Sequence, residues 1–214
     1  MNALKIVAAV LLFMLLAVSC KREPEIIVVT EENGTTDAKG PEVTGSVNVK
    51  VNIEGLLQEK TTSFTLPLPE KKRLRLIRKR LDTFEKGRFA WYGIIENDPG
   101  SFVLISITSK AISGKISSSK GDTYTINYIG QGIHRVDQID ESKLPERNDD
   151  DKEAPVNDTQ GGKERDCPDP ATQVDIMVLY TADAEAGAGG AEGMEAFIYQ
   201  CIYFTNLSYQ NSNV

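Results

Sequence analysis

The chain has 214 residues, with 31 Asp and Glu against 24 Lys and Arg, which gives a formal net charge of −7. An acidic chain of this kind offers no extended surface for phosphate groups, so nucleic acid is excluded as an expected partner. The length allows one domain or two small ones, and three cysteines with a single histidine restrict the metal and redox chemistry available.

The N-terminal segment has the pattern of a bacterial lipoprotein signal peptide. Lys5 precedes an apolar run from Ile6 to Val18, and the small residue Ser19 stands directly before Cys20. The run is shorter than the roughly 20 apolar residues that cross a bilayer, which argues against a permanent span. We therefore expect residues 1–19 to be removed and Cys20 to carry palmitate-type acyl chains. The expected location is the bacterial envelope, at the outer membrane or cell surface.

The next two regions differ in composition. Residues 20–45 are rich in charge, glycine, proline and threonine, apart from the apolar run 26–29, and are expected to be a tether. Residues 46–145 form short alternating runs, such as Val47, Val49 and Val51, separated by turn sequences such as 97–100. A period of two with tight turns predicts antiparallel strands in a meander or sandwich.

One basic cluster lies inside this region, between Lys71 and Arg80, and its cations alternate with leucine and isoleucine. The pattern favours the solvated face of a strand, and contact with lipid headgroups or an acidic partner is the alternative. After it, residues 146–171 are acidic and contain prolines and glycines but little that is apolar. We expect them to form a linker open to proteases.

The last segment, 172–214, has a different pattern. Gln173 to Tyr180 is a nearly continuous apolar run, which predicts a strand buried on both faces of an α/β sheet. A helix is predicted from about Ala191 to Tyr209. Its expected apolar face consists of Met194, Phe197, Ile198, Cys201 and Ile202. The predicted fold class is thus α+β, an antiparallel β-rich domain followed by an incomplete α/β strand and helix.

The candidate site residues outside the lipidation site are few. With Cys20 acylated, Cys167 and Cys201 can pair with each other, stay as thiols, or bond to cysteines of another chain. His134 stands without a second cluster of metal ligands, so a structural or surface role is favoured over catalysis. No catalytic residue and no metal site is predicted within the chain.

The segment from Val174 onward, with VDIMVLYT, a Gly-rich turn and TNLSYQNS, resembles the first strand and helix of bacterial reprolysin-like zinc metallopeptidases of the metzincin group. The region with FAWYGIIENDPGSFVLISI resembles the pro-region that precedes such catalytic domains. The resemblance implies a pro-region that covers the catalytic cleft until the linker is cut. It also implies that Cys167 is a candidate inhibitory ligand for a catalytic zinc. A metallopeptidase catalytic domain is then the expected protein partner, beside the membrane.

This chain departs from that family at the zinc site. The H-E-x-x-H-x-x-G-x-x-H sequence supplies three imidazoles and a glutamate, and His134 is the sole histidine here. Zinc is therefore expected only in a full-length relative. The leading hypothesis is the truncated N-terminal, zymogen part of a lipid-anchored metalloendopeptidase, inactive as given. The alternative is a complete envelope lipoprotein whose β-domain binds a protein or a glycan.

Overall fold

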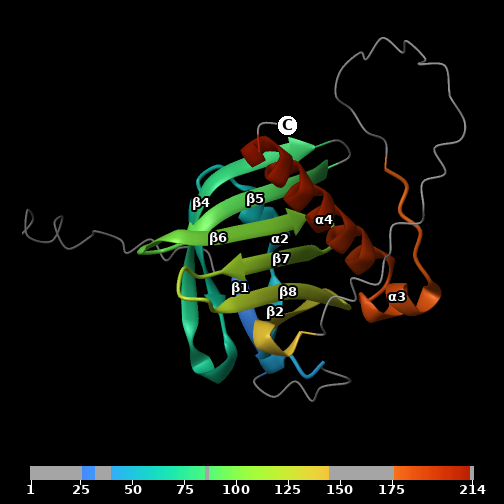
Figure 1. Ribbon diagram of the computed structural model, residues 1–214, viewed down its shortest axis with the longest axis horizontal. Helices are drawn as coiled ribbons and strands as arrows, with labels where there is room; N and C mark the ends of the chain where they lie inside the picture. Colours follow the sequence, from blue (N-terminus) through green and yellow to red (C-terminus); the bar gives the residue numbers. More distant parts are fainter. Residues whose placement is uncertain (1–25, 32–39, 85–86, 145–175, 213–214) are drawn as a thin grey trace, which may run out of the picture.

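The fold is dominated by one antiparallel sheet of nine strands (Figure 1). The computed structural model describes residues 26–31, 40–84, 87–144 and 176–212. The strands are β1 (Ile27–Glu31), β2 (Val43–Val51), β3 (Ser63–Pro67), β4 (Arg73–Phe84), β5 (Arg88–Ile95), β6 (Asp98–Ile107), β7 (Ile112–Ser117), β8 (Thr123–Gly130) and β9 (Ile133–Ile139). Their order in the sheet is β1-β2-β9-β8-β7-β6-β5-β4-β3, so β3 to β9 form a meander and β2 joins beside β9. The predicted antiparallel β-rich domain is confirmed.

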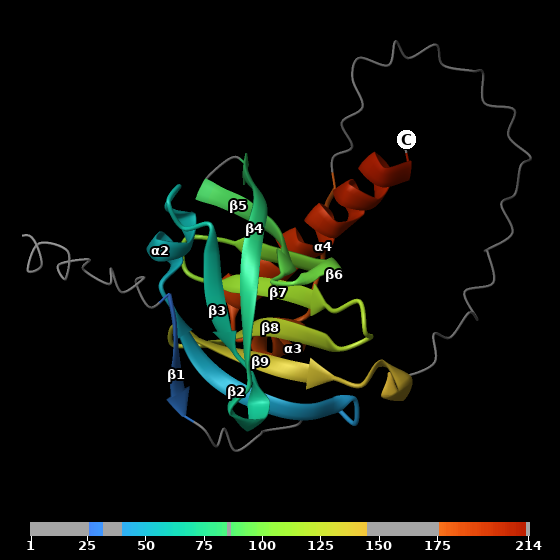
Figure 2. The same ribbon diagram turned by 90° about the vertical axis from the view of Figure 1, so that its left-hand side faces the viewer.

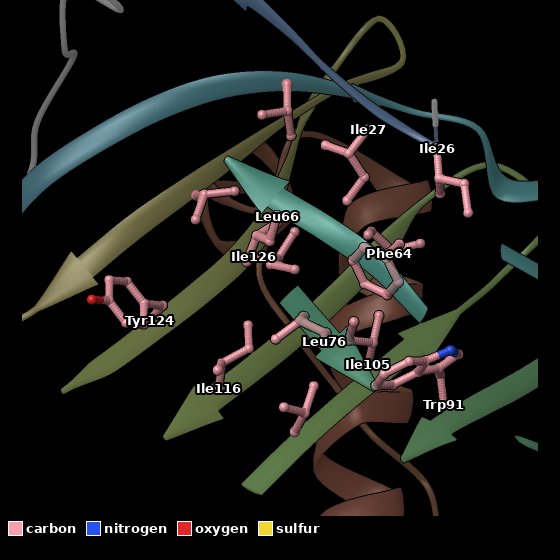
Figure 3. Packing of buried hydrophobic residues seen from close by; sticks show 14 of the residues in the cluster. Ile26, Ile27, Phe64, Leu66, Leu76, Trp91, Ile105, Ile116, Tyr124 and Ile126 are labelled. Atoms are coloured by element: carbon pink, nitrogen blue, oxygen red, sulfur yellow. The ribbon is translucent and has the colours of Figure 1, made fainter. Parts of the chain in front are cut away.

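The sheet curls until its two edges approach each other. β1 and β3 occupy opposite ends of the strand order, yet they contact each other in space (Figure 2). We call this nearly closed arrangement the rolled sheet. The alternating apolar side chains point into it and form one continuous core, as Figure 3 shows for Phe64, Leu66, Trp91 and Ile126. The period of two in the sequence thus arises because successive side chains of a strand point alternately into and out of the rolled sheet.

The prediction that residues 20–45 form a tether is partly wrong. β1 pairs with β2 through Val29 and Val49, and Ile26 and Ile27 are buried in the core. β2 also begins at Val43, before the predicted domain boundary. The short apolar run at 26–29 is therefore the first edge of the sheet, because burying isoleucine side chains is more favourable than leaving them in a solvated tether.

The remaining elements are short helices and one long helix. They are α2 (Ile53–Leu57), the 3-10 turns η1 (Pro69–Lys71) and η3 (Glu141–Lys143), α3 (Ala182–Gly187) and α4 (Ala191–Ser212). Asn52 caps α2 by accepting a hydrogen bond from the backbone N–H of Gly55, and Leu56 of α2 belongs to the core. The helix predicted at 191–209 is confirmed and extends to Ser212.

The strand predicted from Gln173 to Tyr180 is wrong for the described part, 176–180. These residues have no regular secondary structure, and their apolar side chains are 42% to 84% exposed. A strand buried on both faces needs neighbouring strands and a covering layer on each side, and the described residues provide neither to this segment. Thr181, directly after it, caps α3 by accepting a hydrogen bond from the N–H of Ala184.

Candidate functional site: the outer face of the sheet beneath helix α4

Helix α4 lies across the outer face of the rolled sheet (Figure 1). It contacts β6, β7 and β8, and side chains near its middle reach residues of β4 and β5. More than 50 residues of sequence separate α4 from the end of β9, so this packing is a long-range contact. The surface formed by α4 and the strands beneath it is therefore taken as the candidate functional site.

The apolar part of this surface has two centres. Near the start of α4, Ala196 is fully buried and packs with Ala111 and Tyr128. Farther along, Tyr203 is 1% exposed and stacks on Phe84, with ring centroids 4.4 Å apart. Burial of an alanine methyl and an aromatic ring on the same helical face fixes how α4 is rotated about its axis.

The Tyr203 centre continues into strands β5 and β6. Ala90, Tyr92 and Leu104 are buried there and form one cluster with Tyr203. Burial raises the pKa of the Tyr203 hydroxyl above its usual range. The outer face of the sheet is thus apolar where α4 covers it, as expected for a sheet with a layer packed on it.

Polar contacts surround these centres. Arg88 of β5 donates two hydrogen bonds to Oε1 of Glu195, at 3.0 Å from Nε and 2.7 Å from an Nη, and its guanidinium lies 4.4 Å from the ring centroid of Tyr199. The hydrogen bond to Glu195 raises the pKa of Arg88. Lys110 pairs with Glu192 at 2.8 Å and its pKa is raised by that contact. Two acidic residues of α4 thus face two basic residues of the sheet.

A hydrogen bond between Ser113 of β7 and Gln200 of α4 lies between the apolar centres. Its two polar side chains satisfy each other within a largely buried face, which avoids the cost of an unpaired polar group. Ser113 is 2% exposed, so α4 covers it. The apolar face that the sequence predicts for α4 does not include Gln200 or Tyr203, so these contacts were missed.

Glycines let the chain enter α4 close to the sheet. Gly189 has φ of +81°, and a Cβ there would lie 2.6 Å from the carbonyl oxygen of Tyr128. At Gly193 a Cβ would lie 1.8 Å from the carbonyl oxygen of Ala188. Both positions therefore require glycine, because any side chain would collide with backbone. The Gly-rich turn serves this close approach.

The opposite face of α4 is open. Phe197 and Phe204 are 48% and 44% exposed, and Cys201 between them is also exposed. Phe204 contacts the ring of Phe102 of β6 edge to face, at a centroid distance of 5.6 Å. The predicted apolar face is therefore correct only in part, since Phe197 and Cys201 lie on the solvent side of the helix. Met194 is buried, Ile198 is partly buried, and Ile202 packs against the cluster of Tyr203.

The predicted site residues are spread over the chain. Cys20 and Cys167 lie outside the described residues, so the lipidation, the disulfide and the zinc-switch hypotheses stay predictions. Cys201 forms no disulfide within the described ranges, and burial of part of its surface raises the pKa of its thiol. A lower fraction of thiolate makes this cysteine less reactive than a free thiol in water.

His134 is a buried residue of β9, as the structural interpretation of the sequence predicted. It is 1% exposed and its Nε2 accepts a hydrogen bond from the backbone N–H of Ile112 at 3.0 Å. The ring contacts Tyr128 edge to face at 5.2 Å. Burial lowers the pKa of His134 from 6.5 to about 4. The neutral imidazole is therefore a part of the folded structure.

We expect this histidine to make the fold acid-sensitive. Because the folded pKa is below the unfolded value, His134 adds no penalty above pH 6.5 and destabilises the fold as the pH falls toward about 4. The loss is about 3 kcal/mol when the unfolded state binds the proton and the folded state does not. Urea unfolding between pH 7 and 4 measures it. His134→Gln keeps an acceptor for Ile112 without titrating, so its stability should fall less with acid; equal pH dependence of the two proteins would contradict the assignment.

The rolled sheet also carries an open groove lined by polar and apolar residues. It has a volume of about 390 Å³ and is lined by residues of β8 and β9, among them Thr125, Asn127 and Arg135. Asp137 is 2% exposed in the groove and is held by hydrogen bonds from Ser46 and from Nε of Arg135, the latter at 2.9 Å. The groove offers hydroxyl, amide and guanidinium groups to a ligand.

Comparisons of this chain with protein-family models, curated proteins and solved structures give no match. Among the residues that the structure describes, no group of three or more His, Cys, Asp or Glu side chains is arranged to hold a metal ion. Within the same ranges no helix combines the length and the apolar character needed to cross a bilayer.

Proposed function

We propose that this chain is a membrane-anchored lipoprotein whose rolled sheet corresponds to the pro-region of a zinc metalloendopeptidase zymogen. Residues 172–214 would correspond to the start of the catalytic domain. The lipid on Cys20 would hold the protein at the bacterial envelope. The 214 residues include one histidine and no H-E-x-x-H sequence, so a three-histidine zinc site cannot form from them alone.

The observation that carries this proposal is the packing of α4 on the rolled sheet. The sequence of α4 and the turn before it resembles the first catalytic helix of those peptidases. A pro-region that templates a catalytic domain has to contact the first elements of that domain. Here Ala196 and Tyr203 of α4 are buried against the outer face of the sheet, and the proposal requires a contact of this kind.

The exposed segment 176–180 supports the same proposal. Its consecutive apolar side chains, including Met177 at 83% and Leu179 at 84% exposed, are unfavourable in water. In an α/β domain these residues would be covered by neighbouring strands and helices. The exposed side of α4, with Phe197 and Phe204, would face the same domain.

The test is the gene itself, followed by an activity measurement. We expect the reading frames after codon 214 to encode H-E-x-x-H-x-x-G-x-x-H within a few hundred bases. A gene restored to a single frame should then give a protein that cleaves casein, and a zinc chelator should abolish the cleavage. Glu→Gln in that motif is the matched inactive variant. Absence of the motif from every downstream frame would contradict the proposal.

A second candidate function is binding of a glycan or a polar peptide of the envelope. The groove beside Thr125, Asn127 and Arg135 favours it, because its lining combines several hydrogen-bonding side chains with apolar ones such as Ile139. Retention of the protein on purified peptidoglycan sacculi would support this function. The variant Thr125→Trp, whose larger side chain fills the groove, should then be retained less. Thr205→Trp, on the exposed side of α4, is the matched control.

A further inference from the structure

We propose that the outer face of the rolled sheet is a binding site for an amphipathic helix, and that it keeps α4 bound after the chain is cut between residues 146 and 171. The site takes a helix with a small residue, a tyrosine seven positions later and acidic residues near its N-terminus. This proposal has a consequence that rests on the zymogen hypothesis. Cleavage of the linker alone would not release the pro-region from the catalytic domain.

The spacing of the buried residues defines the helix that fits. Ala196 and Tyr203 are seven positions apart, which is two turns of an α-helix, so both point at the sheet. The alanine is fully buried where it packs with Ala111 and Tyr128, so a longer side chain would require these residues to move. The tyrosine lies where Phe84 and Tyr92 provide a ring-lined surface. A helix with these sizes exchanged would not fit.

Charge sets the direction of the bound helix. Glu192 and Glu195 lie near the N-terminus of α4, where negative charge is favourable to the helix itself. Opposite them stand Lys110 and Arg88 of the sheet. The guanidinium of Arg88 is only 21% exposed and combines a two-donor contact to Glu195 with a ring contact to Tyr199. A reversed helix would lose both ion pairs.

The contacts named above between α4 and the sheet are made by residues outside the linker, 146–171. They join strands β4 to β8 and the turn at Lys110 to residues of α4. A cut in the linker changes the effective concentration of α4 at the sheet but removes none of these contacts.

The test uses the full chain, extracted in detergent, with a site-specific protease sequence placed within residues 146–171 and an affinity tag after Val214. After complete cutting, the sheet fragment should stay on the affinity resin and elute together with the tagged α4 fragment at about 1 μM protein. If the sheet fragment washes through the resin, the proposal is overturned. That result would leave the zymogen hypothesis standing, because the downstream reading frame tests it separately.

Paired variants tie the retention to this surface. Ala196→Glu places a carboxylate in the fully buried position and should reduce the retained sheet fragment at least tenfold. Ala191→Glu makes the same change at an exposed position of the same helix and should retain it normally. Equal retention by Ala196→Glu and the unaltered protein would overturn the proposal.

A charge exchange keeps the test valid if Ala196→Glu disturbs folding. Arg88→Glu should lower retention severalfold, and Glu195→Arg added to it should restore retention, because the ion pair is re-formed in reverse. Fluorescence of Trp91, which is fully buried inside the rolled sheet, reports whether each uncut variant is folded. Retention by Arg88→Glu at the unaltered level would count against the proposal.

Discussion

Replacement of Cys20 by alanine is expected to abolish fatty acylation of the chain. The thiol of Cys20 is the predicted acceptor of the lipid, and no other residue of the signal region offers one. More than one acyl chain is needed for stable anchoring, since each buried CH₂ contributes about 0.8 kcal/mol and one chain binds only weakly. Metabolic labelling with an alkyne analogue of palmitate, followed by gel electrophoresis, measures the loss.

The variant should also accumulate as the uncut precursor, because cleavage at a lipobox follows acylation of its cysteine. Ser19→Ala is the matched control, since it keeps a small residue before Cys20 and should be labelled and cut normally. Cys201→Ala should be labelled to the same extent as the unaltered chain. Persistent labelling of Cys20→Ala would contradict the lipoprotein hypothesis and with it the envelope location.

The second large effect, on the stability of the fold, is expected when Gly93 of β5 is replaced by alanine. Gly93 follows Trp91 by two positions, so both lie on the inner side of the rolled sheet. A Cβ at Gly93 would lie 2.3 Å from Cζ3 of Trp91 and 2.4 Å from the backbone oxygen of Ile77 on β4. The oxygen belongs to a paired strand and cannot move without disrupting the ladder.

We therefore expect Gly93→Ala to destabilise the fold by about 3 kcal/mol, at the upper end of the range for overpacked cores. Urea unfolding followed by Trp91 fluorescence measures it. Gly187→Ala is the matched control, because a Cβ there meets nothing within 4 Å and Gly187 lies in helix α3. Its stability should be unchanged or slightly higher. A loss below about 1 kcal/mol for Gly93→Ala would contradict the packing of Trp91 against Gly93.

Gly93 and Trp91 also show how far local patterns can be taken. The alternation around them predicts a strand with an inward Trp91, and the structure confirms it. The sequence does not show that the indole occupies the space above Gly93, because this depends on the approach of β4. Strand identity follows from local period, whereas the requirement for glycine follows from a contact across the sheet.

Helix α4 illustrates a different limit. Its position along the chain was predicted correctly, but its sheet-facing side was predicted only in part, through Met194 and Ile202. Apolar residues occur on both sides of α4, so periodicity alone could not select between Phe197 with Cys201 and Ala196 with Tyr203. The signal that would have helped is the acidic pair Glu192 and Glu195, which lies toward the Ala196 side and finds Lys110 and Arg88 on the sheet.

The segment 176–180 marks the same limit for strands. A continuous apolar run predicts burial, but burial requires partners that the run itself does not specify. In the described residues nothing covers Met177 or Leu179, and the segment has no strand neighbour. The opposite error concerns Ile26 and Ile27. The composition of the surrounding residues predicted a tether there, but both side chains are buried in the core of the rolled sheet.

The sequence by itself determined the alternating strands and the position of α4. It left His134 with a structural or surface role, and its single histidine excludes a three-histidine zinc site formed by these residues alone. It also predicts the acylated Cys20, which lies outside the described residues. These features depend on residue identity and on spacing over a few positions. Only the tertiary structure decided the closure of β1 toward β3 and the side of α4 that meets the sheet, because both arise from contacts between residues far apart in the chain.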